Sequence, residues 1–311
     1  MYSAEKAAVD LRKSGLLKGL VLFGPDGPTN FAPDRIHPTA GGGLDGAGLD
    51  SRSLADGELF VAVKGDHADG RYFTDQVLAR GHWVLAVEAG WSPDQDLAGL
   101  DDQATAAGVL VTADVTAALA VLARHCRSRL PVRVAGVTGT NGKTTTKDFL
   151  AALLRGAGPT CATAGNFNNR LGLPVTVLGL AETDRFSVFE MGASAVGDIA
   201  RLAPVAAPET AIITNAAPAH LAEFGSLQDI IEGKGEILDV LPAHGTAILN
   251  ADSPGFAAWR DRAPCPVASF GRADADHVWA WRADDPQGGP VLEMDGKTWP
   301  VPLPGPHNGA N

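Results

Sequence analysis

The stretch VAGVTGTNGKTTTKDFLAALL, from Val134 to Leu154, joins a short apolar run to a glycine-rich turn and then to a segment whose apolar residues have helical spacing. This order predicts a buried strand, a tight turn and a helix. Several backbone N–H groups and the positive end of the helix dipole would then face one point, which suits a phosphate group. Lys143 would reach the outer phosphates, and the hydroxyl of Thr144 is placed to complete an Mg²⁺ shell.

The spacing of this turn leaves an alternative open. Gly139 and Gly142 let the backbone come close to a ligand without a clash of Cβ atoms. The usual loop is G-x-x-x-x-G-K-[ST], but Val137 stands where its first glycine would fall, so the match is to the shorter G-x-x-G-K-T. Because G-K-T alone is frequent by chance, a structural turn that caps a helix is the alternative. The strand–turn–helix context favours nucleotide-phosphate binding.

Strand and helix patterns alternate on both sides of this stretch. Residues 44–130 predict a small α/β domain, and residues 131–311 predict a mostly parallel sheet flanked by helices, with ligands at the carboxyl ends of its strands. Residues 1–43 begin with a short helix and end in a tract rich in Pro and Gly, so we expect an extension or linker there. Near the end of the chain, VLEMDGKTWPV predicts a hairpin around Asp295-Gly296.

Composition excludes several classes of protein. A chain of 311 residues, 45% of them apolar, is long enough for two globular domains. The net charge of −11 argues against a nucleic-acid or membrane surface. Three cysteines without C-x-x-C spacing predict reduced thiols in a cytoplasmic protein. The apolar segment from Gly15 to Phe23 contains Lys18 and is too short to span a bilayer, so we expect no membrane insertion.

Three more residues lie where predicted elements end or present an apolar face. Glu190 ends a strand and could hold a metal, or it could be an ordinary carboxylate at a strand end. His220 follows another strand, where a hydrogen-bonded structural role is the alternative. Lys234 lies on the apolar face of a helix that begins near Ser226, although a buried lysine is costly unless it is paired or chemically changed. The alternative for Lys234 is a side chain that snorkels to the surface.

Together these residues resemble the Mur ligases, the ATP-dependent amide-forming enzymes of peptidoglycan precursor synthesis. The resemblance covers about residues 44–311 and rests on five motifs: TGTNGKTTT, FEMGA, AHLAEFGS, KGEI and LNADS. Within the family, GNFNNRLGLPVTVL resembles the member that adds D-alanyl-D-alanine to UDP-N-acetylmuramoyl-tripeptide. LDSRS and GELFVAVKGDHADGRYF resemble its uridine-nucleotide domain, but they are nearly as close to the sibling that adds a diamino acid. Asn168-Asn169 favours the former, because the sibling would show two threonines there.

The resemblance implies an acyl-phosphate mechanism with ATP and two Mg²⁺ ions. Its catalytic residues would be Lys143, Glu190, His220 and Lys234. The metal ligands would be Thr144 and Glu190 for one ion, with His220 helping to hold the second and Lys234 carbamylated. The nucleotide would contact Gly139, Thr140, Asn141, Gly142, Lys143, Thr144, Thr145, His307, Asn308 and Asn311. The UDP-sugar would contact Ser51, Arg52, Gly65, Asp69, Asn168 and Asn169. The partners would be UDP-N-acetylmuramoyl-tripeptide and D-alanyl-D-alanine, and the expected protein is a cytoplasmic monomer.

The chain also departs from the family pattern. Ser194 and Ala195 stand where the family has Asn and His, and Ala222 stands where it has Glu. The segment PLPGPHNGAN resembles the one that leads into the family's third, C-terminal domain. We therefore expect two of three domains here, and a fragment that binds substrates but does not turn over. The alternatives are the diamino-acid-adding sibling and a nucleotide-sugar-binding module that has lost catalysis. A plain P-loop kinase or GTPase would leave His220 and Lys234 unexplained.

Overall fold

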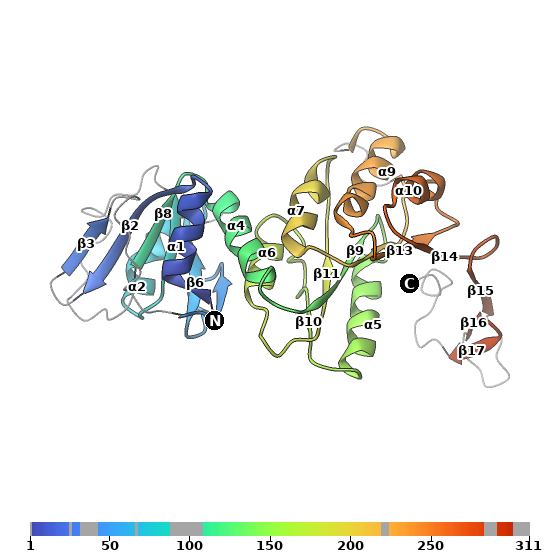
Figure 1. Cartoon of the computed structure of the whole chain (residues 1–311), viewed down its shortest axis with the longest axis horizontal. Helices are drawn as coiled ribbons and strands as arrows, with labels where there is room; N and C mark the ends of the chain where they lie inside the picture. Colours follow the sequence, from blue (N-terminus) through green and yellow to red (C-terminus); the bar gives the residue numbers. More distant parts are fainter. Residues whose placement is uncertain are drawn as a thin grey trace. The chain divides into compact units, whose positions relative to one another are not determined.

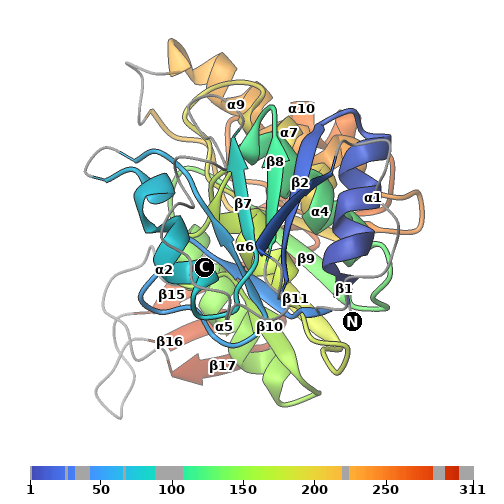
Figure 2. The same ribbon diagram turned by 90° about the vertical axis from the view of Figure 1, so that its left-hand side faces the viewer.

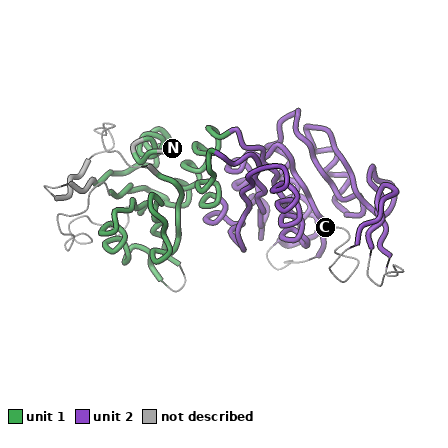
Figure 3. The backbone as a smooth tube through the Cα atoms, turned by 90° about the horizontal axis from the view of Figure 1, so that it is seen from below, with its two compact units in different colours: residues 1–130, 174–182 green, residues 131–173, 183–311 purple. Residues whose placement is uncertain are grey.

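The computed structural model describes residues 2–24, 27–31, 43–65, 68–87, 108–218, 224–282 and 291–300. The chain forms two compact units (Figure 3). The first contains Met1–Leu130 and Pro174–Glu182, and the second contains Pro131–Leu173 and Thr183–Asn311. No helix in the described ranges is long and apolar enough to cross a membrane.

The first unit is built on a six-stranded mixed sheet. Its strand order is β3 (Gly27–Phe31), β2 (Leu17–Gly24), β8 (Gly108–Thr112), β7 (Val84–Val87), β6 (Glu58–Val61) and β5 (Gly46–Gly48). The strands from β8 to β5 are parallel, whereas β2 is antiparallel to both of its neighbours. A separate two-stranded sheet pairs β1 (Tyr2–Ser3) with β4 (Gly43–Leu44).

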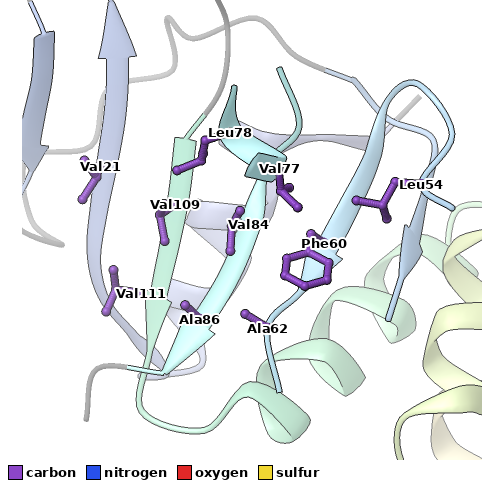
Figure 4. Close-up of a cluster of buried hydrophobic side chains, with 10 residues drawn as sticks. All are labelled: Val21, Leu54, Phe60, Ala62, Val77, Leu78, Val84, Ala86, Val109 and Val111. Carbon is purple, nitrogen blue, oxygen red and sulfur yellow. The ribbon is translucent and has the colours of Figure 1, made fainter. Parts of the chain in front are cut away.

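The side chains of the buried strands in the first unit form two core layers, one on each face of the sheet. Phe60, Val84 and Val109 pack with Val77 and Leu78 of α2 (Thr74–Leu78), which follows the short helix η2 (Gly70–Phe73) (Figure 4). The next residue on each strand points to the opposite face. There α1 (Ala4–Lys13) and α4 (Val115–Arg127) pack together (Figure 2).

The expectation that residues 1–43 lie outside the first domain is wrong for the part that the structure describes. Four residues of α1 are fully buried: Ala4, Ala7, Ala8 and Leu11. β2 lies inside the sheet, where it pairs with β3 and β8. Strand β8 is far away in sequence, so local composition could not reveal this pairing. The expected short helix at the start of the chain is confirmed as α1.

The second unit is built on a nine-stranded sheet. Its order is β10 (Thr160–Ala162), β11 (Phe186–Glu190), β9 (Arg133–Thr138), β12 (Thr210–Ile213), β13 (Thr246–Asn250), β14 (Val267–Gly271), β15 (His277–Arg282), β16 (Val291–Met294) and β17 (Lys297–Pro300). The strands from β10 to β15 are parallel, and β15, β16 and β17 are antiparallel. The predicted hairpin is confirmed, because Asp295 and Gly296 turn β16 into β17 with positive φ angles of 52° and 72°.

Helices cover both faces of the parallel part of this sheet, as Figure 1 shows. Helix α5 (Lys143–Arg155) packs on β9, β10 and β11. The opposite face carries α7 (Asp198–Ala206), α9 (Leu227–Gly235) with η3 (Glu236–Val240), and α10 (Phe256–Arg262). A further helix, α6, spans Gly172–Leu178. The predicted fold class is thus confirmed: α/β, with a mostly parallel sheet flanked by helices.

The order of the strands places a topological switch point at the carboxyl end of β9. The chain runs from β9 to β10 and β11 on one side, and it then continues with β12 on the other side of β9. The connections therefore diverge at β9, which is where ligands bind in open sheets of this kind.

Candidate nucleotide and metal site at the carboxyl end of β9

The turn after β9 has the tight backbone conformation that its two glycines predicted. Strand β9 ends at Thr138, and α5 begins at Lys143. Gly139 and Gly142 have positive φ angles of 145° and 80°, and a Cβ atom at Gly139 would overlap the hydroxyl of Thr214. The turn thus ends at the amino terminus of a helix, where free N–H groups and the helix dipole favour an anion.

Residues at the end of β12 hold the tip of this loop. The hydroxyl of Thr214 donates to the carbonyl of Asn141 at 2.6 Å. The side chain of Asn215 accepts from the Asn141 N–H at 3.0 Å and donates to its carbonyl at 3.2 Å. Thr140 is fixed in the same way, since its hydroxyl accepts from the Ala217 N–H at 3.1 Å. Sequence reasoning missed Thr214 and Asn215, although a polar pair directly after a buried strand was a usable signal.

Lys143 lies over the loop that precedes it. Its ammonium donates to the carbonyl of Thr140 at 3.0 Å. Burial lowers the pKa of Lys143, and the negative charge of Glu190 partly opposes this shift. The predicted phosphate-binding lysine and the predicted metal-binding carboxylate are therefore electrostatic neighbours.

Glu190 ends β11 and is 2% exposed. One carboxylate oxygen accepts from the hydroxyl of Thr144 at 2.8 Å, and the other accepts from the amide of Asn168 at 2.8 Å. The Glu190 N–H donates to the hydroxyl of Thr163 at 3.0 Å. A carboxylate and a hydroxyl side by side are oxygen ligands of the kind that Mg²⁺ prefers, so the two residues predicted to share an ion fit one.

Lys234 is buried, at 3% exposed, so the alternative of a side chain that snorkels to the surface is wrong. Its ammonium donates to the carbonyl of Ala193 at 3.3 Å and lies 5.0 Å from the centre of the Phe224 ring. Burial, and then the positive charge of Lys143, lower the pKa of Lys234 to about 8. The helix α9 thus directs an amine with a lowered pKa toward the segment that follows Glu190.

The two predicted asparagines have different surroundings. Asn168 contacts the carboxylate of Glu190 and packs against Gly192, so it lies next to the two predicted metal ligands, Thr144 and Glu190. Asn169 is exposed, and its side-chain oxygen accepts from the N–H groups of Leu171 and Gly172 at the start of α6. Thr145 lies within the first turn of α5 and is half-buried.

Four of the residues predicted to bind the UDP-sugar, Ser51, Arg52, Gly65 and Asp69, lie in the first unit, on loops after β5 and β6, whereas Asn168 and Asn169 lie in the second. The side chain of Arg52 is 88% exposed and pairs with Asp50 at 2.7 Å, while the carbonyl of Ser51 accepts from Arg80. Gly65 donates its N–H to Ala68 at 2.9 Å. Asp69 pairs with Arg71, whose hydrogen bonds lower the pKa of the Asp69 carboxyl. His220, His307, Asn308 and Asn311 lie outside the described residues.

Comparisons with known proteins point to one family. The Mur ligase middle domain matches residues 137–311. The UDP-N-acetylmuramoyl-tripeptide--D-alanyl-D-alanine ligase of Escherichia coli (strain K12) is 36% identical over 277 residues, which are 86% of this chain and 58% of that protein. The enzyme of the same name from Bacillus subtilis (strain 168) is 34% identical over 271 residues, which are 86% of this chain and 56% of that protein.

Two solved structures are similar as well. MurF from Acinetobacter baumannii superimposes with a TM-score of 0.75 at 31% identity, over 89% of this chain and 59% of that one. The MurF ligase from Thermotoga maritima, in complex with ADP, gives a TM-score of 0.68 at 30% identity, over 83% of this chain and 58% of that one. The chain therefore spans somewhat more than half the length of these relatives. The match of the middle domain over more than half of the chain shows what the loop, Glu190 and the Lys234 segment predicted: this chain belongs to the Mur ligase family.

Proposed function

We propose that this chain belongs to an enzyme that adds D-alanyl-D-alanine to UDP-N-acetylmuramoyl-tripeptide in an ATP-dependent reaction in the cytoplasm. The relatives from E. coli and B. subtilis are both named UDP-N-acetylmuramoyl-tripeptide--D-alanyl-D-alanine ligase. The observation that carries the proposal is the contact between Thr144 and Glu190, next to Lys143 at the amino terminus of α5. A phosphate bound at that terminus would meet a cation on one side and a pair of metal ligands on the other.

The residues of this chain would act chiefly by binding and orienting. The N–H groups of Gly142 and Lys143, at the amino terminus of α5, would hold the β- and γ-phosphates, whereas those of Thr140 and Asn141 donate to Asn215. The ammonium of Lys143 would offset the charge that grows on the transferred group. Mg²⁺, bound through Thr144 and Glu190, would supply further positive charge at the same phosphate oxygens. The tripeptide carboxylate would displace ADP from the γ-phosphorus, and the amine of the dipeptide would then displace phosphate from the acyl carbon.

We further propose that Lys234 carries a carbamate. A lysine with a lowered pKa has a larger share of the neutral amine, which can attack CO₂, form an N–C bond and release a proton. The product is an anion with oxygen donors, suited to a second Mg²⁺ that His220 would help to hold. Labelling with ¹³C-bicarbonate tests this step: we expect a carbamate signal in the ¹³C spectrum that is missing in Lys234→Arg.

The uridine diphosphate would bind to the first unit through Ser51, Arg52, Gly65 and Asp69. Arg52 supports this proposal because its guanidinium is exposed although it is paired with Asp50. We also propose that the protein is a monomer, which sedimentation at several concentrations would test.

Thermal stability with Mg²⁺ tests the proposal on the 311-residue chain. We expect UDP-N-acetylmuramoyl-tripeptide and a non-hydrolysable ATP analogue each to raise the midpoint, because a ligand that binds only the folded state stabilises it by mass action. Lys143→Met should abolish the response to the ATP analogue and keep the response to the sugar. Arg155→Met, at the other end of α5, is the matched control and should keep both.

The contrary outcomes are distinct. If only the ATP analogue raises the midpoint, the chain is a P-loop protein that does not bind UDP-N-acetylmuramoyl-tripeptide. No shift with either ligand would contradict the proposal as a whole. A shift with the sugar alone would favour a nucleotide-sugar-binding module, the reading to which Ala195 and Ala222 point because they stand where the family has His and Glu.

A further inference from the structure

Lys147 is a buried cation that the proposed chemistry does not use. It lies one turn after Lys143 on α5 and is 4% exposed. Its ammonium pairs with Asp148 at 2.7 Å, but that carboxylate is largely in solvent. An ammonium is costly to bury unless hydrogen bonds compensate for its lost hydration. The interior partner of Lys147 is the carbonyl of Thr163, at 2.8 Å.

Thr163 connects three elements through its three polar groups. It follows β10 directly and is 1% exposed. Its N–H donates to the carbonyl of Val188 in β11 at 3.1 Å, and its hydroxyl accepts from the N–H of Glu190 at 3.0 Å. Its carbonyl accepts from Lys147 in α5. A single residue therefore joins the carboxyl end of β11 to the helix that follows the phosphate loop.

These hydrogen bonds form a closed ring together with the side chain of Glu190 and the backbone of α5. Thr144 and Lys147 are three residues apart on α5, so their side chains lie on neighbouring parts of one helix face. Thr144 contacts the carboxylate of Glu190 directly, whereas Lys147 reaches the backbone of Glu190 through Thr163. Two attachments fix the position of Glu190 relative to α5 more tightly than one, and that position sets the separation of the two predicted metal ligands.

We propose that Lys147 is a positioning residue for the metal site: through Thr163 it holds Glu190 where the carboxylate can share an ion with Thr144. The inference rests on the proposed function only in that Mg²⁺ binds with a nucleotide at Thr144 and Glu190. The positive charge matters because a charged donor makes the stronger hydrogen bond to a carbonyl. Groups that orient a metal ligand typically change metal affinity or activity by about 10- to 100-fold when removed.

The test measures how much Mg²⁺ the chain needs to bind a non-hydrolysable ATP analogue, by calorimetry over a series of Mg²⁺ concentrations and again in EDTA. Lys147→Met keeps the length of the side chain and removes the donor. Thr163→Val keeps its shape and removes the hydroxyl, and Thr163→Ser restores that hydroxyl. Asp148→Asn is the matched control, because it removes the exposed charge beside Lys147 and leaves the contact with Thr163 in place.

We expect Lys147→Met and Thr163→Val each to raise the half-saturating Mg²⁺ concentration about tenfold, with little change in the affinity measured in EDTA. Thr163→Ser and Asp148→Asn should stay near the wild-type value. In a Glu190→Gln background, Lys147→Met should have no further effect on the Mg²⁺ requirement. Thr163→Val keeps the test meaningful if Lys147→Met does not fold, because it interrupts the same ring at another atom.

Other outcomes overturn the inference. If Lys147→Met lowers the melting temperature and leaves the Mg²⁺ requirement of the folded chain unchanged, Lys147 has a structural role only. If Asp148→Asn acts like Lys147→Met, the exposed ion pair is the important contact. If the wild-type chain binds the analogue without any need for Mg²⁺, or if Glu190→Gln changes nothing, the proposed metal site has failed together with the inference.

Discussion

The ammonium of Lys234 gives the chain a stability that depends on pH. The pKa falls from 10.5 to about 8 on folding, because burial and Lys143 disfavour the charged form. The unfolded chain therefore binds more protons than the folded chain between these two values, so this group makes stability rise with pH there. Below pH 8 the folded chain carries the full free-energy cost of burying the charged ammonium. For a pKa shift of this size, that cost is about 3 kcal/mol.

We therefore expect Lys234→Met to raise the free energy of unfolding by about 3 kcal/mol at pH 7 and by much less at pH 10. Urea denaturation in bicarbonate-free buffer without nucleotide measures both values. Lys18→Met, at an exposed position of β2, is the control and should change neither. An equal gain from Lys234→Met at both pH values would contradict the lowered pKa.

Gly139 is the residue whose backbone the phosphate loop depends on most directly. Its φ of 145° is unfavourable for other residues, and a Cβ atom there would overlap the hydroxyl of Thr214. We expect Gly139→Ala to abolish binding of the ATP analogue and to destabilise the chain by about 2 kcal/mol or more. Calorimetry and urea denaturation check the two effects.

Gly165 supplies the matched control for this substitution. It also has a positive φ, of 50°, but a Cβ atom there would meet nothing within 4 Å. Gly165→Ala should therefore show only the backbone penalty, about 1–2 kcal/mol, and keep nucleotide binding. Equal loss of binding in both variants would mean that backbone strain, rather than the close approach to Thr214, is responsible.

At the scale of elements, α7 is stabilised by a carboxylate from another helix. Gly197 precedes α7 and has no side chain to cap it, but the buried carboxylate of Glu236 accepts from the N–H groups of Gly197 and Ala200. We expect Glu236→Gln to destabilise the chain by about 1–3 kcal/mol, since it removes a charged acceptor and places an amide donor against N–H groups. Urea denaturation at pH 7 measures the difference.

Glu232 is a suitable control for Glu236. It lies on the same run of helix, but its side chain is half in solvent and pairs with Arg262 at 2.9 Å. Exposed pairs of this kind contribute about 0–1 kcal/mol, so Glu232→Gln should have a small effect. If both variants cost the same, α7 does not depend on the carboxylate of Glu236.

The sequence predicted the elements whose signals are local and missed the contacts that are not. The strand β9 and the helix α5 follow from apolar spacing around one glycine-rich turn, so they were predictable. The position of β2 in the first sheet was not, because it depends on pairing with β8 across the length of the domain. The contact of Asn168 with Glu190 could not be predicted from local spacing, and neither could that of Lys147 with Thr163, because Thr163 follows β10 and lies outside α5.

For the whole molecule, the division into two units predicts where each ligand binds. The residues expected to contact uridine diphosphate all belong to the first unit, and the loop from Gly139 to Lys143 belongs to the second. A net charge of −11 means that neither anion is attracted by the chain as a whole, so binding must come from local groups. The effect of each ligand on backbone dynamics should accordingly be local.

Hydrogen–deuterium exchange can separate the two sites. With Mg²⁺, the ATP analogue should slow exchange in the second unit around Gly139 to Thr145 and at Thr214 to Ala217, because a ligand suppresses the local openings of the segment that it contacts. UDP alone should slow exchange around Ser51 and around Gly65 to Arg71 in the first unit. Lys143→Met should abolish only the first pattern, and Arg52→Ala should weaken only the second. If the ATP analogue protects the first unit and leaves the loop after β9 unchanged, the phosphate site lies elsewhere, and the pairing of Thr144 with Glu190 has another purpose.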